Sequence, residues 1–145
     1  MKVWYNVSMS KIDLAYTAGI IDGEGCIRIG QRRLHSNYIG VGVGSTSEWL
    51  INWLQFKYGG SVYSKKPWLA NQKPQWGWDL RTRQAGDFLR MILPYLKLKR
   101  PQAELALAFQ SRRRYRGHQP MSAEDIALDD ADKILMHKYN KRGID

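Results

Sequence analysis

Four segments of the chain alternate between apolar residues and residues that are polar or glycine, and these segments come in two pairs. The first pair spans residues 26–32 and 38–45, around a short polar turn, and the second pair spans 61–66 and 75–82. A period of two places successive side chains on opposite faces of a strand, so each segment predicts a strand with one face on a core. The pattern therefore predicts a four-stranded antiparallel sheet.

Helical patterns fill the segments between and after these strands. Ser10 and Ser122 each suit the N-cap position of a helix, and Asp125 completes a capping box with Ser122. The order αββαββα, followed by C-terminal helices, predicts an α+β fold. The predicted helices cover residues 11–22, 47–58 and 84–96, then a helix from about Pro101 to the basic run 112–116, then a last helix after Ser122.

The length and the charge limit the classes of protein to which the chain can belong. Its 145 residues fit one domain, with a core over about 11–112 and a C-terminal helical extension over 113–145. A formal net charge of +10 indicates a polyanionic partner, and nucleic acid is the first candidate. No apolar stretch approaches the roughly 20 residues of a membrane span. We expect no membrane partner.

Cysteine and histidine are scarce. One cysteine excludes an internal disulfide, and three scattered histidines exclude a zinc site of ordinary spacing. The N-terminus lacks the apolar core of a secretion signal, so we expect an intracellular protein.

The first predicted helix carries small residues on one face. Ala15, Ala18, Gly19 and Asp22 follow the spacing i, i+3, i+4 and i+7, which allows the backbone of a second helix to come close. Leu14, Thr17 and Ile21 lie on a separate stripe that can enter the subunit's own core.

Two acids, Asp22 and Glu24, follow at the C-terminal end of that helix. The helix dipole disfavours carboxylates there, so a cation is needed to offset them, and a divalent metal is one candidate. The alternative is that Asp22 is a solvated helix-end residue and Glu24 an ordinary loop acid.

The segment 17–25, TAGIIDGEG, resembles the signature of the LAGLIDADG homing endonucleases, with Thr17 at the place of the first Leu and Glu24 at the place of the last acid. Residues 58–62, YGGSV, and 93–99, LPYLKLK, also resemble segments of that family. The resemblance covers roughly residues 11–112, and it includes one motif. The chain is therefore similar to the homodimeric branch of the family.

The resemblance implies an intron-encoded, site-specific double-strand DNA homing endonuclease. It would hydrolyse phosphodiester bonds at a long pseudo-palindromic site and leave short 3′ overhangs. The motif helices of two subunits would pack together through Ala15, Ala18, Gly19 and Asp22. Glu24 and the carbonyl of Gly23 would bind Mg²⁺, with Mn²⁺ as a substitute and Ca²⁺ binding without supporting cleavage.

The resemblance also implies two further catalytic positions. Lys99 corresponds to a basic residue near the scissile phosphate, and the alternative is a surface lysine. Ser45 stands where the family often has a Gln or Asn that contacts the attacking water, but the following helix is shorter here. The water-positioning role therefore stays open.

DNA recognition is expected on the polar face of the sheet, where a curved sheet can follow the major groove. The strand glycines allow either close backbone approach to DNA or a bulge, and Trp76 and Trp78 are expected in the core, with base stacking as the alternative. The basic run 112–116 is either a phosphate contact or a solvated helix end. The expected DNA-binding residues are Arg28, Gly30, Arg32, Tyr38, Gly40, Gly42, Tyr63, Lys65, Lys66, Asp79, Arg81 and Arg83.

Two alternatives compete with a nuclease. One is a catalytically silent DNA-binding regulator, or an RNA-splicing maturase, with the same fold. The other is a general nucleic-acid-binding protein with little preference among sequences. The sequence does not distinguish a bacterial or phage cytoplasm from an organelle.

Overall fold

A computed structural model describes residues 9–67, 69–113 and 120–141. The predicted α+β class and element order are confirmed, and the antiparallel sheet has the strand order β1-β2-β4-β3. The elements are α1 (Lys11–Glu24), β1 (Gly25–Arg33), β2 (Ser36–Ser45), α2 (Glu48–Tyr58), β3 (Ser61–Lys65), β4 (Gln75–Arg81), α3 (Thr82–Ile92), a 3₁₀ turn η2 (Leu93–Tyr95), α4 (Arg100–Ser111) and α5 (Ala123–Asn140).

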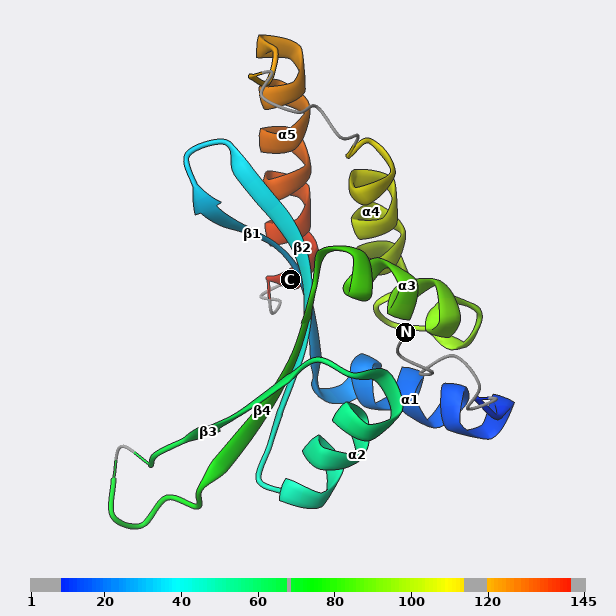
Figure 1. The fold of residues 1–145 in the computed structure, drawn as a ribbon, viewed down its shortest axis with the longest axis vertical. Coiled ribbons are helices and arrows are strands. Elements are labelled where there is room, and N and C mark those ends of the chain that lie inside the picture. The colour runs from blue at the N-terminus through cyan, green and yellow to red at the C-terminus, as the bar shows by residue number, and fades with distance from the viewer. Residues whose placement is uncertain (1–8, 68, 114–119, 142–145) are drawn as a thin grey trace, which may run out of the picture.

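The sheet is strongly twisted, and helices α1 to α4 lie on one side of it while the two hairpins extend away from them (Figure 1). The side chains that alternate toward the helices form the core, and they include Ile27, Val41 and Trp78, each fully buried. Phe88 and Leu89 of α3 are buried in the same cluster. Helices α1 to α4 leave the opposite face of the sheet uncovered (Figure 1).

The pairing register determines which residues share that free face, because directly opposed residues of neighbouring strands point the same way. Arg28 lies opposite Gly40, and Gly40 lies opposite Arg81. Gly42 lies opposite Asp79, which in turn lies opposite Ser61. The alternation in the sequence therefore assigned these side chains to the correct face.

Two helix boundaries differ from the prediction. Helix α1 continues through Gly23 and ends at the C-cap Gly25, whose N–H donates to the carbonyls of Ile20 and Ile21. Helix α3 ends at Ile92 rather than at residue 96, and a 3₁₀ turn containing Pro94 follows it. Proline lacks the N–H that an α-helix would need there, which explains the early end.

Helix α2 presents more aromatic surface than its pattern predicts. Ile51 and Leu54 are its buried residues, whereas Trp49 is 65% exposed and stacks on Trp53, with the ring centroids 6.2 Å apart. The helical spacing of Trp49, Leu50, Trp53 and Leu54 predicts one buried stripe, and the structure buries only part of it. Trp49 therefore packs on Trp53 of its own helix, whereas Ile51 and Leu54 lie on the helix face that is buried.

Helix α5 starts at the predicted capping box of Ser122 and Asp125 and packs against β1. The Asn140 side chain donates to the Ile27 carbonyl (2.7 Å), and the Asn37 side chain donates to Asp129 (3.1 Å). Helix α5 therefore packs against the β1–β2 hairpin and holds it through these two side-chain hydrogen bonds. No helix in the described part of the chain is long and apolar enough to cross a membrane.

The start of the basic run is not a solvated helix end, because its first two arginines pair with acids of α5. Arg113 donates to Asp129 of α5 (3.0 Å), and Arg112 pairs with Asp132 of the same helix. Both guanidinium groups also lie over the ring of Phe109. These two arginines join α4 to α5, and residues 114–116 of the run lie outside the described residues.

Candidate active site and nucleic-acid interface

Asp22, near the C-terminal end of α1, holds the segment that precedes α4. Its carboxylate accepts hydrogen bonds from three consecutive backbone N–H groups, those of Lys97 (2.9 Å), Leu98 (3.2 Å) and Lys99 (2.9 Å). Hydrogen bonds to a charged acceptor are among the stronger ones in proteins. Asp22 was predicted at a subunit interface, and the structure shows that its carboxylate is used within the subunit.

Lys99 makes the reciprocal contact. Its Nζ donates to the backbone carbonyls of Ile21 (2.9 Å) and Asp22 (3.1 Å) at the end of α1. A cation at this place offsets the negative end of the helix dipole. The cation expected near Asp22 is therefore a lysine of the same chain, and Asp22 and Lys99 together form what we term the α1–α4 clamp.

Glu24 is the last residue of α1, and its side chain is exposed. No hydrogen bond or ion pair holds its carboxylate within residues 9–67, 69–113 and 120–141. No group of three or more His, Cys, Asp or Glu residues that could hold a metal occurs in this part either. One chain thus supplies one available carboxylate at the end of α1, next to the carbonyl of Gly23.

A groove of about 630 Å³ on the free face of the sheet brings Glu24 together with half of the predicted DNA-binding residues. Its lining comes from all four strands of the sheet and from the end of α1 and the start of α3. Its lining residues are Glu24, Cys26, Arg28, Gly42, Val43, Gly44, Ser61, Tyr63, Lys65, Asp79, Arg81 and Gln84.

An ion-pair cluster occupies the middle of this groove. Asp79 Oδ1 accepts a hydrogen bond from Arg28 Nη2, and Asp79 Oδ2 accepts one from Arg81 Nε at 2.9 Å. The side chain of Asp79 is 12% exposed, against 31% for Arg28 and 51% for Arg81. The hydrogen bond that Arg81 donates to Asp79 raises the pKa of the Arg81 guanidinium above its ordinary value. We term these three residues the arginine cluster.

The strand glycines have a purpose within the subunit that neither sequence interpretation foresaw. A Cβ on Gly40 would lie 2.8 Å from the guanidinium carbon of Arg28, and one on Gly30 would lie 2.6 Å from the ring of Tyr38. A Cβ on Gly77 would lie 2.3 Å from the ring of Tyr63. Each glycine makes room for a side chain that lies flat across the sheet.

Of the two explanations expected for these glycines, the bulge is wrong at Gly30 and Gly40. Side chains of the chain itself lie over both positions, Tyr38 over Gly30 and Arg28 over Gly40. Neither glycine forms a bulge, because the irregularity in the β1–β2 register lies between Gln31 and Arg33.

Tyr38 and Tyr63 extend the groove with cation–π contacts. The guanidinium carbons of Arg32 and Arg81 each lie 5.2 Å from the centroid of the Tyr38 ring. The Nζ of Lys65 lies 5.8 Å from the centroid of the Tyr63 ring. Such contacts orient long cationic side chains that would otherwise move freely.

Several predicted site residues lie apart from the groove lining, namely Gly30, Arg32, Tyr38, Gly40, Ser45, Lys66, Arg83 and Lys99. Ser45 lies opposite Trp76, which shares a face with the buried Trp78, and its hydroxyl accepts a hydrogen bond from the N–H of Ser47 (3.0 Å). Lys66 follows the end of β3, and Arg83 lies in the first turn of α3, beyond the last strand. Both of these cationic side chains are exposed.

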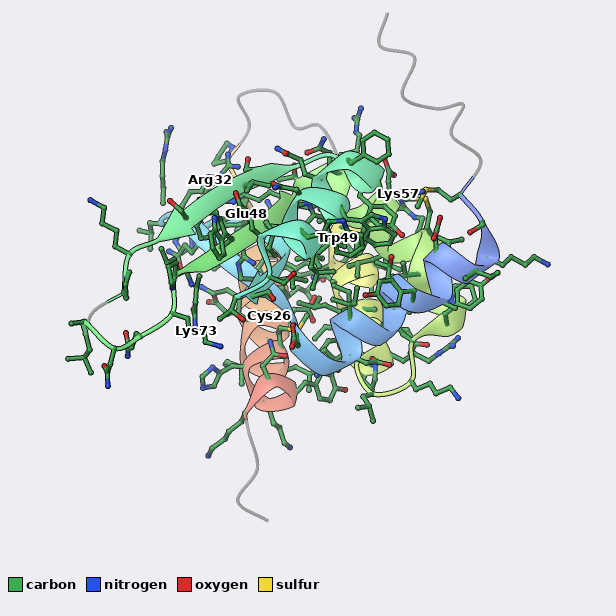
Figure 2. The ribbon with its side chains drawn as sticks, turned by 90° about the horizontal axis from the view of Figure 1, so that it is seen from below. Cys26, Arg32, Glu48, Trp49, Lys57 and Lys73 are labelled. Carbon is green, nitrogen blue, oxygen red and sulfur yellow. The ribbon has the colours of Figure 1, made fainter. Side chains whose placement is uncertain are left out.

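Cys26, Ser61 and Gln84 line the groove although sequence reasoning did not select them. Alternation from Arg28 and from Tyr63 was sufficient to find the first two, whereas nothing in the sequence indicates Gln84. Figure 2 shows Lys73 on the loop that projects from the sheet, on the opposite side of the molecule from Lys57, with Cys26 between them in this view.

The exposed face of α1 differs from the predicted interface stripe. Ala18 is fully buried in the subunit's own core, so its assignment to the interface is wrong. Ala15 and Gly19 are exposed. A Cβ on Gly19 or on Gly23 would meet nothing within 4 Å.

Thr17, which replaces the first Leu of the motif, is buried and links α1 to α2. Its hydroxyl donates to the carbonyl of Asp13 (2.8 Å) and lies 2.6 Å from the Tyr58 hydroxyl. Burial raises the pKa of Tyr58, although the hydrogen bond between the Tyr58 and Thr17 hydroxyls acts in the opposite direction. Lys57 adds an ion pair to Asp13 (3.0 Å), so polar contacts join the two helices where the motif has an apolar residue.

No family model and no curated protein sequence matches the chain. Solved structures do match it. The homing endonuclease I-CvuI in complex with its target (Sro1.3), in the presence of 2 mM Ca, is 23% identical with a TM-score of 0.71, over 92% of this chain and 87% of that chain.

Two further structures are similar to the chain. The archaeal intron-encoded homing endonuclease I-Vdi141I complexed with DNA is 12% identical with a TM-score of 0.70, over 92% of this chain and 87% of that chain. The K262A mutant of I-SmaMI is 15% identical with a TM-score of 0.54, over 91% of this chain but 46% of that chain. The chain therefore has the fold of the LAGLIDADG homing endonucleases, as the resemblance of its first helix and strand order implied.

Proposed function

We propose that the protein is a site-specific double-strand DNA endonuclease that works as a homodimer and needs a divalent metal. The observation that carries the proposal is that Glu24 lines the same groove as Arg28, Tyr63 and Arg81. An exposed carboxylate next to a row of cationic side chains has the right composition for hydrolysing a bound polyanion.

The argument for DNA rests on charge, shape and the neighbours. A net charge of +10 favours a polyanion, and a curved antiparallel face with arginines in its middle can enter the major groove. I-CvuI and I-Vdi141I, whose folds are similar, were both solved in complex with DNA. In this proposal Lys65, Lys66 and Arg83 contact phosphates, while Arg28 and Arg81 contact base edges.

The argument for a homodimer rests on two helical glycines. Glycine inside a helix costs about 1 kcal/mol relative to alanine, and nothing in the subunit lies close to Gly19 or Gly23. Both lie on the exposed face of α1, with Ala15. Close approach of a second α1 helix gives these residues a purpose. I-SmaMI, of which the chain covers 46%, has room for two such units in one chain.

The catalytic proposal assigns the metal to Glu24 and to the carbonyl of Gly23. Oxygen ligands suit Mg²⁺, and the exposed Glu24 carboxylate is available to it, with a second one provided by the second subunit. When bound, Mg²⁺ stabilises charge on the phosphate and activates water. Mn²⁺ is expected to substitute, and Ca²⁺ is expected to bind without supporting cleavage.

The chain's own residues position this site. The α1–α4 clamp fixes the end of α1, and with it the backbone that carries Glu24. Lys99 acts in this proposal through that contact and through its charge near the phosphate. Ser45 stays a candidate for ordering water, although its hydroxyl also stabilises the turn before α2. Two-fold symmetry would produce a long pseudo-palindromic site, and we expect short 3′ overhangs.

The test is to incubate the protein with a randomised duplex library and Mg²⁺ and to sequence the cut ends. We expect one recurring site with a matching cut on each strand. A recurring site that is bound but never cut would identify a regulator instead. Binding without any preferred site, with a steep salt dependence, would identify a general nucleic-acid-binding protein.

A further inference from the structure

Asp79 is an acid in the centre of a face that otherwise favours a polyanion. Its side chain is 12% exposed, and each of its carboxylate oxygens is bound to a different arginine. An acid at this position opposes binding to phosphate, so its presence needs a reason. The reason lies in what it does to Arg28 and Arg81.

Arg28 reaches Asp79 across an intervening strand. Arg28 lies on β1 and Asp79 on β4, with β2 between them. The guanidinium crosses β2 over Gly40 and Gly42, where a Cβ would lie 2.8 Å from its carbon and 3.3 Å from its Nη1, respectively. The two glycines therefore keep open the path along which Arg28 lies.

Arg81 is fixed by two contacts. Its Nε donates to Asp79 at 2.9 Å, and its guanidinium carbon lies 5.2 Å from the centroid of the Tyr38 ring. Because Arg81 uses Nε in this bond, its two terminal NH₂ groups are not part of the ion pair. An arginine carries five N–H donors, so each guanidinium keeps several after binding one carboxylate oxygen.

We propose that Asp79 is a specificity-determining positioning residue, which holds Arg28 and Arg81 as rigid donors that read base edges rather than phosphates. The proposal rests on the proposed function, since it concerns how the same groove reads DNA. A rigid arginine fork discriminates guanine through its O6 and N7 acceptors, whereas a mobile arginine binds any phosphate within reach. Asp79 also offsets one of the two positive charges and thereby weakens binding to arbitrary sequences.

The test compares Asp79→Asn with the wild type, in Ca²⁺ so that DNA is bound without being cut. Affinity is measured for the recurring site and for random duplex, each over a range of salt concentrations. We expect discrimination between the two to fall about tenfold, because one bidentate contact is worth that much. We also expect log K against log salt to steepen by about 0.9, as for one additional phosphate contact.

Asp87→Asn is the matched control. Asp87 is an exposed acid on α3 that pairs with Arg90, so the substitution makes the same change of charge away from the groove. We expect it to leave both discrimination and salt dependence unchanged. If Asp87→Asn has the same effect as Asp79→Asn, net charge alone explains the result, and the positioning role is wrong.

Arg28→Lys tests the proposal independently of whether Asp79→Asn folds. Lysine keeps the charge but lacks the planar fork, so we expect discrimination to fall about tenfold while the salt dependence stays the same. Replacing guanines of the recurring site with 7-deazaguanine should weaken wild-type binding more than Arg28→Lys binding, because the variant keeps only the Arg81 contact to guanine N7. A merely structural role for the cluster would not produce this difference.

The two proposals fail in different ways. If the wild type cuts a recurring site and both variants discriminate as well as it does, the assignment of Asp79 is wrong and the proposed function stands. If the wild type shows no recurring site, the proposed function is wrong, and the assignment of Asp79 fails with it.

Discussion

The arginine cluster and the end of α1 both concentrate charge at the groove, but they differ in how that charge is satisfied. In the arginine cluster, both oxygens of Asp79 are bound within the subunit. At the end of α1, Asp22 is bound by three backbone N–H groups, while the carboxylate of Glu24 has no such partner in the described ranges 9–67, 69–113 and 120–141. One folded chain therefore satisfies both oxygens of Asp79 and leaves the Glu24 carboxylate available.

In the proposed function, this difference separates DNA binding, for which one chain suffices, from hydrolysis, which needs two chains. The cationic face is assembled from the strands of a single sheet, so in the proposed function binding to half of a DNA site needs no partner. A hydrolytic centre with several oxygen ligands needs more than Glu24 and the Gly23 carbonyl. We therefore expect changes on the exposed face of α1 to affect cleavage much more strongly than the fold.

The largest expected effect is that of Glu24→Gln on cleavage. Loss of the charged ligand should lower the cleavage rate by at least about 100-fold, because metal binding depends on an ionised carboxylate. Binding in Ca²⁺ should change much less, since the arginine cluster is untouched. Glu48→Gln removes an equally exposed acid from α2 and should leave cleavage intact. Full cleavage by Glu24→Gln would remove Glu24 from the metal site.

Gly19→Leu should have the next largest effect, on association. Nothing in the subunit lies within 4 Å of a Cβ at this position, so the larger side chain should not disturb the monomer. It should weaken dimerisation roughly 100-fold, which corresponds to about 2.7 kcal/mol. Sedimentation at several protein concentrations measures this.

Gly19→Ala sharpens the same comparison. Alanine favours the helix by about 1 kcal/mol, so the monomer should unfold at a higher temperature while the dimer dissociates more easily. If both Gly19 variants sediment as the wild type does, the subunits meet elsewhere.

Substitutions in the α1–α4 clamp should have an intermediate effect, and the quantity affected should be the stability of the fold. Asp22→Ala removes three hydrogen bonds to a charged acceptor and should lower the free energy of unfolding by about 2–3 kcal/mol. Lys99→Met should cost about 1–2 kcal/mol, because the end of the helix dipole loses its cation. Urea unfolding measures both. Unchanged stability in both variants would show that the clamp does not hold the end of α1.

Thr17→Val should cost about 1 kcal/mol of stability. The variant keeps the side-chain shape but leaves the Tyr58 hydroxyl without its partner inside the protein. Tyr58→Phe removes the other member of the pair, and the double variant should cost less than the sum of the two. A thermal-unfolding double-mutant cycle tests this, and strict additivity would mean that the two hydroxyl groups do not interact.

The smallest effect concerns acid stability. A hydrogen bond from Lys57 lowers the pKa of Asp13 below its ordinary value of 3.8 in the folded protein. The unfolded chain therefore takes up this proton first as the pH falls, and the stabilisation present above pH 3.8 is lost below it. Lys57→Met should reduce the fall in unfolding temperature between about pH 5 and pH 2. An identical pH profile for wild type and variant would exclude this contribution.

The fold was predictable because a period of two maps directly onto the faces of a sheet. Ile27, Val41 and Trp78 each lie on the face that the alternation assigns to them, and all three are buried. The same reasoning placed Arg28 and Arg81 on the free face. Alternation along a strand is a local rule that depends only on neighbouring residues. It holds wherever one face of the sheet is buried.

The contacts between distant elements were not predictable. Asp22 lies 77 residues from Lys99, and no spacing in the sequence indicates that they meet. On α1, the sequence grouped Ala18 with Gly19, although only the packing of α3 and η2 against α1 decides which of these neighbours is buried. The glycines of β2 were misread for the same reason, because the side chain that covers Gly40 comes from β1.

The central claim is that two copies of the chain bring their Glu24 residues together at one bound duplex. Cys26 is the only cysteine in the sequence, it is exposed, and it lies two residues after Glu24 in the same groove. A nitroxide on Cys26 permits a pulsed dipolar measurement between copies. We predict a single, short, narrow distance between the two labels in the Ca²⁺ complex with the recurring site. In the free protein, without DNA, Gly19→Leu should abolish the distance. Absence of any dipolar coupling in that complex would contradict the account.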